Sequence, residues 1–262
     1  MGTTKQRVRD YWDRSPCGAR DAAPFPEGSR EFFDEVERQR FSGDDFMPEI
    51  CRFEAWTGKS VLEVGCGLGT DLIRFARAGA HVWGTDLTDR AIRLTGTRFS
   101  REDLPATLMV ADAERIPFQG DQFDLVYSWG VIHHTPRPDL AARELLRVCR
   151  SGGRVVAMVY HRRSLFALQA WIVYALGRGK PWLSASKVIA EHVESPGTKA
   201  YSVAEARRLF LGLEQVSVRP VVTRYDVRVG RRSFLPGWVR RSIPGPLGWF
   251  LVVEGSKPSA SP

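Results

Sequence analysis

The sequence predicts an α/β fold in which helices cover both faces of a mostly parallel sheet, with an N-terminal helical segment and a helical cap insertion. Between residues 60 and 160, short apolar strand patterns alternate with amphipathic helix patterns, which is typical of such a sheet. Before this region, and again over 161–213, the patterns are mainly helical. We therefore expect four parts: an N-terminal segment or lid (1–56), a core (57–160), the cap (161–213), and closing strands with a tail (214–262).

Apolar spacing, together with helix and turn signals, justifies each element in order. In the first two parts, helices are expected over 4–16, 29–40, 44–55, 71–78, 89–99 and 138–149. The strands that alternate with the later helices are expected over 61–64, 81–85, 106–110, 123–128 and 153–160. Further helix patterns cover 165–176, 185–192 and 204–210, and two closing strands are expected over 216–222 and 249–253.

The composition is that of an ordinary soluble globular protein. Hydrophobic residues make up 43% of the chain and charged residues 26%, so a sizeable core is expected rather than disorder. No apolar run approaches the roughly 20 residues that span a bilayer. The four cysteines are scattered and form no CxxC pair, which predicts neither a metal site nor a disulfide framework. Since the chain also begins with polar and charged residues, a cytoplasmic enzyme is expected.

The net charge of +8 permits nucleic acid as a partner. The basic residues are spread along the chain, however, so a small-molecule partner is favoured over nucleic acid, and no oligomeric state is predicted. Only the C-terminal part is locally rich in arginine: Arg219, Arg224, Arg228, Arg231, Arg232, Arg240 and Arg241. These arginines keep RNA binding open as an alternative.

The stretch VLEVGCGLGTD places three glycines on alternating positions directly after an expected strand. Glycine allows positive φ and lets a ligand approach the backbone, and the helix that follows offers free N–H groups. In the dinucleotide pattern GxGxxG the third glycine would stand at position 70, where this chain has Thr70. The turn therefore suits a nucleoside with a small amino-acid tail better than a pyrophosphate.

Two acids follow the next two strands. Asp86 ends the second strand about 20 residues after the turn, at the distance expected for a carboxylate that binds ribose hydroxyls. Its alternative role is to cap the next helix, for which Thr88 or Asp89 is better placed. Asp112 follows the third strand, where its carboxylate can accept from an adenine amino group while the Ala113 N–H donates to a ring nitrogen. The carboxyl ends of parallel strands meet in one crevice, so these groups should converge.

In this order, the segments VLEVGCGLGTD, GTDLTD, ADAERIPF and FDLVYSWGVIHHTP resemble the class I S-adenosylmethionine-dependent methyltransferases. The resemblance covers roughly residues 60–160 and implies a Rossmann-like, seven-stranded sheet whose last strand is antiparallel. It implies S-adenosylmethionine as the cofactor of the core. Its implied cofactor-binding positions are Tyr11, Glu63, Gly65, Cys66, Gly67, Gly69, Asp86, Leu87, Asp112, Ala113 and Ser128. Among these, Glu63 would orient the amino-acid end, and Ser128 would face the methionine portion. The N-terminal stretch YWDRSPCG also looks like the opening of small-molecule members of this family, in which Tyr11 would close over the ligand.

Methyl transfer to a hydroxyl or amine also requires removal of a proton. His133 and His134 follow the fourth strand, beside the expected methyl position, and titrate in the useful range. Only one of two adjacent residues is expected to face the site, and a packing role for the pair is the alternative. The Asn/Asp-Pro-Pro-Tyr motif of enzymes that methylate exocyclic base amines is absent, since residues 128–131 read SWGV.

Acceptor choice is expected to reside outside the core. The stretch SLFALQAWIVYALGRGKPWL is apolar on nearly all sides, so it either packs as a cap helix or forms a wall around a hydrophobic or aromatic acceptor. The sequence thus predicts methyl transfer to oxygen, nitrogen or carbon of a small molecule. The alternatives are an RNA methyltransferase, a catalytically silent cofactor-binding protein, and an NAD-dependent oxidoreductase, which Thr70 disfavours.

Overall fold

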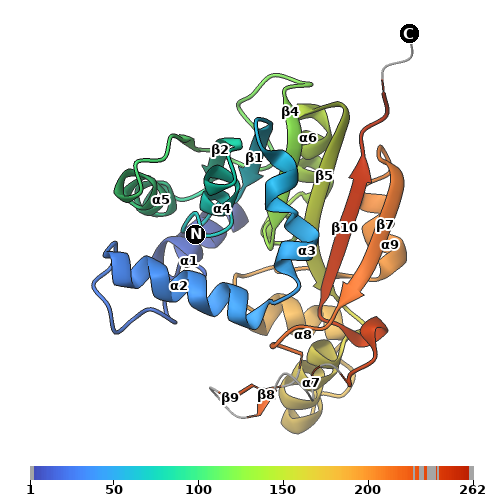
Figure 1. The fold of residues 1–262 in the computed structure, drawn as a ribbon. Coiled ribbons are helices and arrows are strands. Elements are labelled where there is room, and N and C mark those ends of the chain that lie inside the picture. Colours follow the sequence, from blue (N-terminus) through green and yellow to red (C-terminus); the bar gives the residue numbers. More distant parts are fainter. Residues whose placement is uncertain (1–2, 227, 230–232, 235–239, 241, 260–262) are drawn as a thin grey trace.

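The computed structural model describes residues 3–226, 228–229, 233–234, 240 and 242–259. Its main sheet follows the order β3-β2-β1-β4-β5-β10-β7, and the short strand β6 pairs with β5 (Figure 1). These strands are β1 (Ser60–Val64), β2 (His81–Asp86), β3 (Thr107–Val110), β4 (Phe123–Trp129), β5 (Cys149–His161), β6 (Ala200–Tyr201), β7 (Glu214–Val221) and β10 (Phe250–Ser256). Only β10 runs antiparallel to its neighbours, so the expected α/β fold with a seven-stranded, mostly parallel sheet is confirmed.

Two helical layers cover the sheet. On one face α6 (Pro138–Val148) and α9 (Val203–Leu209) pack on the β-strands, and on the other face lie α3 (Met47–Cys51), α4 (Leu72–Arg77) and α5 (Asp89–Arg101). Alternation along β1 decides which side chains meet which layer, because Leu62 and Val64 join the first core and Val61 joins the second.

The helix predicted over 44–55 forms only over Met47–Cys51, because Arg52 adopts a left-handed backbone conformation with φ of 47°. That residue ends α3, and a 3₁₀ turn, η1 (Phe53–Trp56), leads into β1 instead. The other N-terminal helices, α1 (Thr4–Arg14) and α2 (Arg30–Gly43), form as expected, each with a side-chain cap at its first turn.

The segment expected as one cap divides in two. The helices α7 (Leu165–Tyr174) and α8 (Ala185–His192), joined by the turn η3 (Leu176–Arg178), pack on each other beyond the carboxyl end of β5. Helix α9 lies instead on β7 and β10, where Ala206 joins the core of the sheet. The ribbon β8 (Arg228–Val229) and β9 (Ser233–Phe234) and the turn η4 (Gly245–Leu247) precede β10. Among the described residues, no helix is long and apolar enough to cross a membrane.

Candidate cofactor and acceptor cavity

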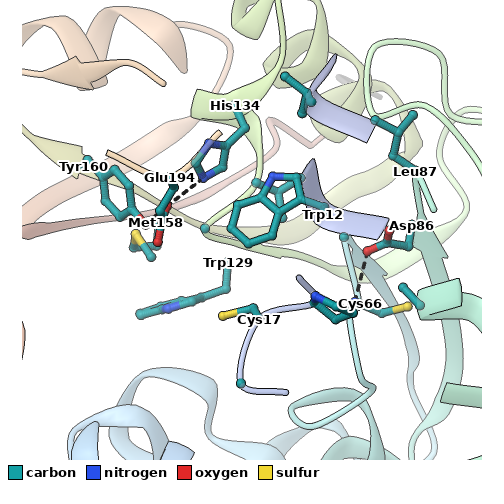
Figure 2. A pocket seen from close by; sticks show the side chains of 18 of the residues that line it. Trp12, Cys17, Cys66, Asp86, Leu87, Trp129, His134, Met158, Tyr160 and Glu194 are labelled. Carbon is teal, nitrogen blue, oxygen red and sulfur yellow. Dashed lines mark hydrogen bonds and ion pairs between the residues drawn. The ribbon is translucent and has the colours of Figure 1, made fainter. Parts of the chain in front are cut away.

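A cavity of about 790 Å³ lies at the carboxyl edge of the sheet. It begins at the turn after β1 and at the ends of β2 and β3, and it continues past the segment after β4 towards α7 and α8 (Figure 2). Helices α1 and α2 close it from the N-terminal side. The cavity therefore joins the region expected to bind a nucleoside with the region expected to bind an acceptor.

The three glycines of the turn all have positive φ, at 82° for Gly65, 54° for Gly67 and 67° for Gly69. A Cβ atom on Gly65 would lie 2.2 Å from Val131, and one on Gly69 would lie 2.7 Å from Thr95, so these two glycines permit close packing. A Cβ atom on Gly67 would meet no protein atom within 4 Å. The open space above Gly67 is where a ligand can approach the backbone.

Asp86 holds the turn together. Its Oδ2 atom accepts from the Gly67 N–H at 3.1 Å, and its Oδ1 atom accepts from the N–H and hydroxyl of Thr88 at 2.9 Å each. The N-cap of α5 is Thr88. Helix capping, the alternative role considered for Asp86, is therefore carried out by Thr88 instead. Burial raises the pKa of Asp86, although these hydrogen bonds oppose the shift. A carboxylate offers about four lone-pair sites, which leaves capacity for ligand hydroxyls.

Glu63 lies at the amino-acid end of the expected ligand site. Its side chain is buried, and its Oε2 atom has no hydrogen-bond partner among the described residues. Burial, and next the charge of Asp71, raises the pKa of Glu63 well above its ordinary value. A buried carboxyl oxygen without a partner is costly unless something else pairs with it, and a ligand ammonium group would do so.

Asp71 follows the glycine turn and is clamped by α2. The Arg40 guanidinium donates to both Asp71 oxygens at 3.1 and 2.7 Å and to Asp44 at 2.8 Å. The Tyr127 hydroxyl donates to the same carboxylate at 2.8 Å. This largely buried network ties the N-terminal segment to the start of α4, and nothing in the sequence pattern predicted it.

Asp112 lines the cavity at its other end, as expected, and its Oδ2 atom lies 2.5 Å from Lys5 Nζ of α1. Its Oδ1 atom accepts from the N–H of Glu114 at 2.9 Å. Cys66, Leu87 and Ala113 also line the cavity. An adenine amino group at Asp112 would share that carboxylate with the Lys5 ammonium.

Three of the expected cofactor residues, Tyr11, Gly69 and Ser128, do not line the cavity. Trp12, rather than Tyr11, lines the cavity from α1, because Lys5, Val8 and Trp12 share one face of that helix. Ser128 is fully buried, does not line the cavity, and donates its hydroxyl to the Val64 carbonyl at 3.1 Å. The structure therefore brings Trp12 rather than Tyr11 to the cavity, and after β4 it brings Trp129 and Gly130 there rather than Ser128.

Only His134 of the two adjacent histidines faces the cavity. His133 is fully buried against the Tyr160 ring at a centroid distance of 4.0 Å, and burial lowers its pKa well below the ordinary value. The His134 Nδ1 atom lies 2.8 Å from the Ser195 hydroxyl and 3.0 Å from the Thr198 hydroxyl. These contacts fix the ring so that Nε2 points towards the cavity.

Glu194 completes this corner, and no sequence signal identified it. Its Oε2 atom lies 3.3 Å from His134 Nε2 and accepts from the Tyr160 hydroxyl at 2.6 Å (Figure 2). Its backbone has φ of 56°, which is unusual for a non-glycine residue. Ligand-type atoms of His133, His134 and Glu194 lie within 4.8 Å of one another, so they could also hold a metal ion. In this corner the fold holds a carboxylate, a phenol and an imidazole together in contact with the cavity.

Aromatic side chains from several elements surround the far part of the cavity. They are Trp129, Tyr160, Phe166, Tyr225, Trp249 and Phe250. The Tyr160 and Trp249 rings stack at 4.3 Å, and the ring of Phe166 lies 4.3 Å from Trp249. A flat apolar molecule would find stacking partners here.

Some of the arginines considered for RNA binding form ion pairs within the protein. Three of them face carboxylates at 4.0, 3.9 and 2.7 Å: Arg219 with Glu49, Arg224 with Asp21, and Arg240 with Asp45. The other four lie outside the described side chains. The described arginines therefore form internal contacts more than a phosphate-binding surface.

The cavity fits the cofactor that the sequence resemblance implies. The partnerless Glu63 oxygen matches an amino group, the space above Gly67 admits the ligand, and Asp86 and Asp112 lie where hydroxyl and amino protons would be. The residues that would hold S-adenosylmethionine are thus Glu63, Gly67, Asp86 and Asp112, with Trp12 beside them.

Comparison with known proteins agrees with this geometry. Residues 61–153 match the family described as "Methyltransferase domain". The chain is 40% identical to an uncharacterised protein of Mycobacterium tuberculosis over 98 residues, which cover 37% of this chain and 36% of that protein. The aligned part thus spans about a third of that relative's length. Over 200 residues, the chain is 26% identical to demethylmenaquinone methyltransferase of Thermobifida fusca, covering 74% of this chain and 80% of that protein.

Magnesium protoporphyrin IX methyltransferase of Synechocystis PCC 6803, solved with bound SAH, has the same fold. The two share a TM-score of 0.59 at 16% identity, over 97% of this chain and 99% of that chain. The family match contains the glycine turn, both acids that follow it and both histidines. Residues 61–153 therefore match the methyltransferase-domain family, as the sequence resemblance implied.

Proposed function

We propose that the protein transfers the methyl group of S-adenosylmethionine to an oxygen, nitrogen or carbon atom of a small hydrophobic or aromatic molecule. The observation that carries this proposal is the continuity of the cavity. One end has the glycine turn and the acids suited to the cofactor, and the other has aromatic walls and the His134–Glu194 pair. A relative that matches most of the chain is named a methyltransferase of demethylmenaquinone, which supports a small acceptor.

When bound, S-adenosylmethionine supplies an electrophilic methyl group on sulfur. The chain's own residues must aim the acceptor, exclude water and take a proton from a hydroxyl or amine acceptor. The His134–Glu194 pair is placed to receive this proton, because its facing atoms lie 3.3 Å apart and share one corner of the cavity. The hydroxyls of Ser195 and Thr198 hold His134 in place, and the Tyr160 hydroxyl donates to Glu194.

The aromatic residues would select the acceptor. Tyr160 belongs both to the His134 corner and to the aromatic wall, so a ring bound against that wall would present its substituents to the proton-accepting pair. The sulfonium cofactor and the acceptor would then meet beside Trp12 and Met158. A strongly polar acceptor would gain little binding free energy from these aromatic walls, because it has little apolar surface to bury.

The test is a crystal structure with S-adenosylhomocysteine, together with a transfer assay that uses a methyl-labelled cofactor. The product should lie along Gly67, Asp86 and Asp112, and a volume bordered by the aromatic residues should remain beside its sulfur. Hydroxylated aromatic acceptors should become labelled. The absence of any S-adenosylhomocysteine binding in equilibrium dialysis would refute the proposal. Binding without turnover across the acceptor panel would indicate a catalytically silent protein, and labelled RNA would indicate the nucleic-acid alternative.

A further inference from the structure

The hairpin formed by α7, η3 and α8 exposes large apolar side chains. Leu168 and Ile172 lie one turn apart on α7 and are 52% and 46% exposed, and Leu176 in the following turn is 50% exposed. Trp182, between η3 and α8, is 75% exposed. We name these four side chains the apolar face of the hairpin. Scattered single exposed residues need no explanation, but these four lie on one short segment together with Val173, which is 52% exposed and also lines the cavity.

Positive charge accompanies the apolar face. The hairpin, residues 165–192, contains Arg178, Lys180 and Lys187 and one acid, Glu191, which pairs with Lys187 at 2.8 Å. Every residue from 176 to 182 is exposed, and in this loop Arg178 and Lys180 alternate with Leu176 and Trp182. The same surface therefore offers apolar groups, an indole ring and cations.

We propose that the apolar face and its neighbouring cations dock on the surface of an anionic lipid bilayer. Leucine, isoleucine and tryptophan side chains insert at the boundary between headgroups and acyl chains, and lysine and arginine are attracted to anionic headgroups. A second copy of this chain is a poorer occupant. Two such surfaces would bring the exposed cations Arg178 and Lys180 of both copies together, because Glu191, the one carboxylate of the hairpin, already pairs with Lys187.

Docking would place the cavity next to the bilayer. Ala170 and Tyr174 line the cavity from α7, Leu168 and Ile172 of the same helix face solvent, and Val173 does both. A hydrophobic acceptor dissolved in the membrane could thus reach the cavity across one helix. This consequence depends on the proposed function, whereas the docking itself does not and can be measured without any methyl transfer.

The experiment is co-sedimentation of the full chain with vesicles, either of phosphatidylcholine alone or of phosphatidylcholine mixed with phosphatidylglycerol. The wild-type protein should sediment with the mixed vesicles, and less so in high salt. The double variant Leu168→Gln/Ile172→Gln should bind at least tenfold more weakly, and so should Trp182→Ala. The double variant Arg178→Gln/Lys180→Gln should lose its preference for the anionic vesicles.

Leu211 provides the matched control. It is 76% exposed and follows α9 just before β7, at the opposite edge of the sheet, so Leu211→Gln removes a large exposed apolar side chain away from the hairpin. This variant should bind vesicles as the wild type does. The proposal is overturned if the wild type stays in the supernatant at low salt, or if Leu211→Gln weakens binding as much as the hairpin variants. A concentration-dependent dimer that Leu168→Gln/Ile172→Gln dissociates, without vesicle binding, would identify the face as a contact between copies.

Discussion

The Nε2 atom of His134 lies 3.3 Å from the Oε2 atom of Glu194, although 59 residues separate the two in the chain. Tyr160 donates to the same oxygen, so three elements meet at this point: the turn after β4, the end of β5, and the segment after α8. A proton taken from an acceptor would be shared by the pair, and the resulting imidazolium would face a carboxylate.

His134→Ala and Glu194→Gln should each lower the turnover number about 10²-fold, because both remove part of the proton-accepting pair. The affinity for S-adenosylhomocysteine, measured by calorimetry, should remain as in the wild type. Glu191→Gln changes an exposed carboxylate of α8 that pairs with Lys187, and it should leave turnover unchanged. If His133→Ala abolishes turnover while His134→Ala spares it, the two histidines have been assigned the wrong roles.

Asp86→Ala should weaken the binding of S-adenosylhomocysteine by about 1–3 kcal/mol, because hydrogen bonds to a charged group are lost. The variant also loses the hydrogen bond that the Gly67 N–H donates to the Asp86 carboxylate at 3.1 Å. Asp89→Ala, on the first turn of the helix that follows, alters an exposed neighbour and should bind normally. Titration calorimetry measures the affinity of both variants for S-adenosylhomocysteine. Equal affinities would refute the assignment of Asp86 to the ribose.

Gly67→Ala should impair ligand binding beyond its cost to stability. The residue has φ of 54°, so alanine is strained there by about 1–2 kcal/mol. Gly179 has φ of 69° and, like Gly67, would place a Cβ atom in open space, so Gly179→Ala shares the backbone cost alone. Urea unfolding should show similar losses for both variants, but only Gly67→Ala should lose affinity for S-adenosylhomocysteine. Equal affinities would mean that the space above Gly67 is not occupied by the ligand.

Local patterns were sufficient to predict the elements of the core. Strand β1 alternates between two cores, the turn that follows is set by glycines, and α8 runs over the residues expected. The break at Arg52 was missed because a left-handed arginine has no signal in apolar spacing. Trp12 could have been found, since helical periodicity places it on the face of Lys5 and Val8.

The contacts that complete the site are long-range, and for this reason they were not predictable. Glu194 belongs to no motif, and its position beside Tyr160 depends on how the chain returns from α8 to the sheet. The clamp of Arg40 on Asp71 likewise joins residues 31 positions apart in the chain. A single sequence shows which residues have suitable chemistry, but such pairings require the packed structure.

Arg40→Gln should destabilise the protein by about 3–5 kcal/mol, because it leaves Asp44 and Asp71 as buried carboxylates without their cation. Arg38→Gln is the control on the same helix. Arg38 is exposed and pairs only with Glu35 of its own helix among the described residues, so its loss should change stability little. The free energy of unfolding in urea measures both. Similar values for the two variants would show that the Arg40 clamp does not hold the N-terminal segment on the core.

The affinity for S-adenosylhomocysteine should rise with pH, and Glu63 should be the reason. Burial and the neighbouring Asp71 raise the pKa of Glu63 well above its ordinary value, so the ligand-free protein keeps this carboxyl protonated at a pH where an exposed glutamate is ionised. The ammonium group of the ligand favours the ionised carboxylate, and binding therefore releases a proton until the pH exceeds the raised pKa. Calorimetry over about pH 5 to 8, in buffers with different ionisation enthalpies, should detect that proton. Glu63→Gln should bind more weakly and lose this component of the pH dependence; a Glu63→Gln profile as steep as that of the wild type would assign the titration to another group.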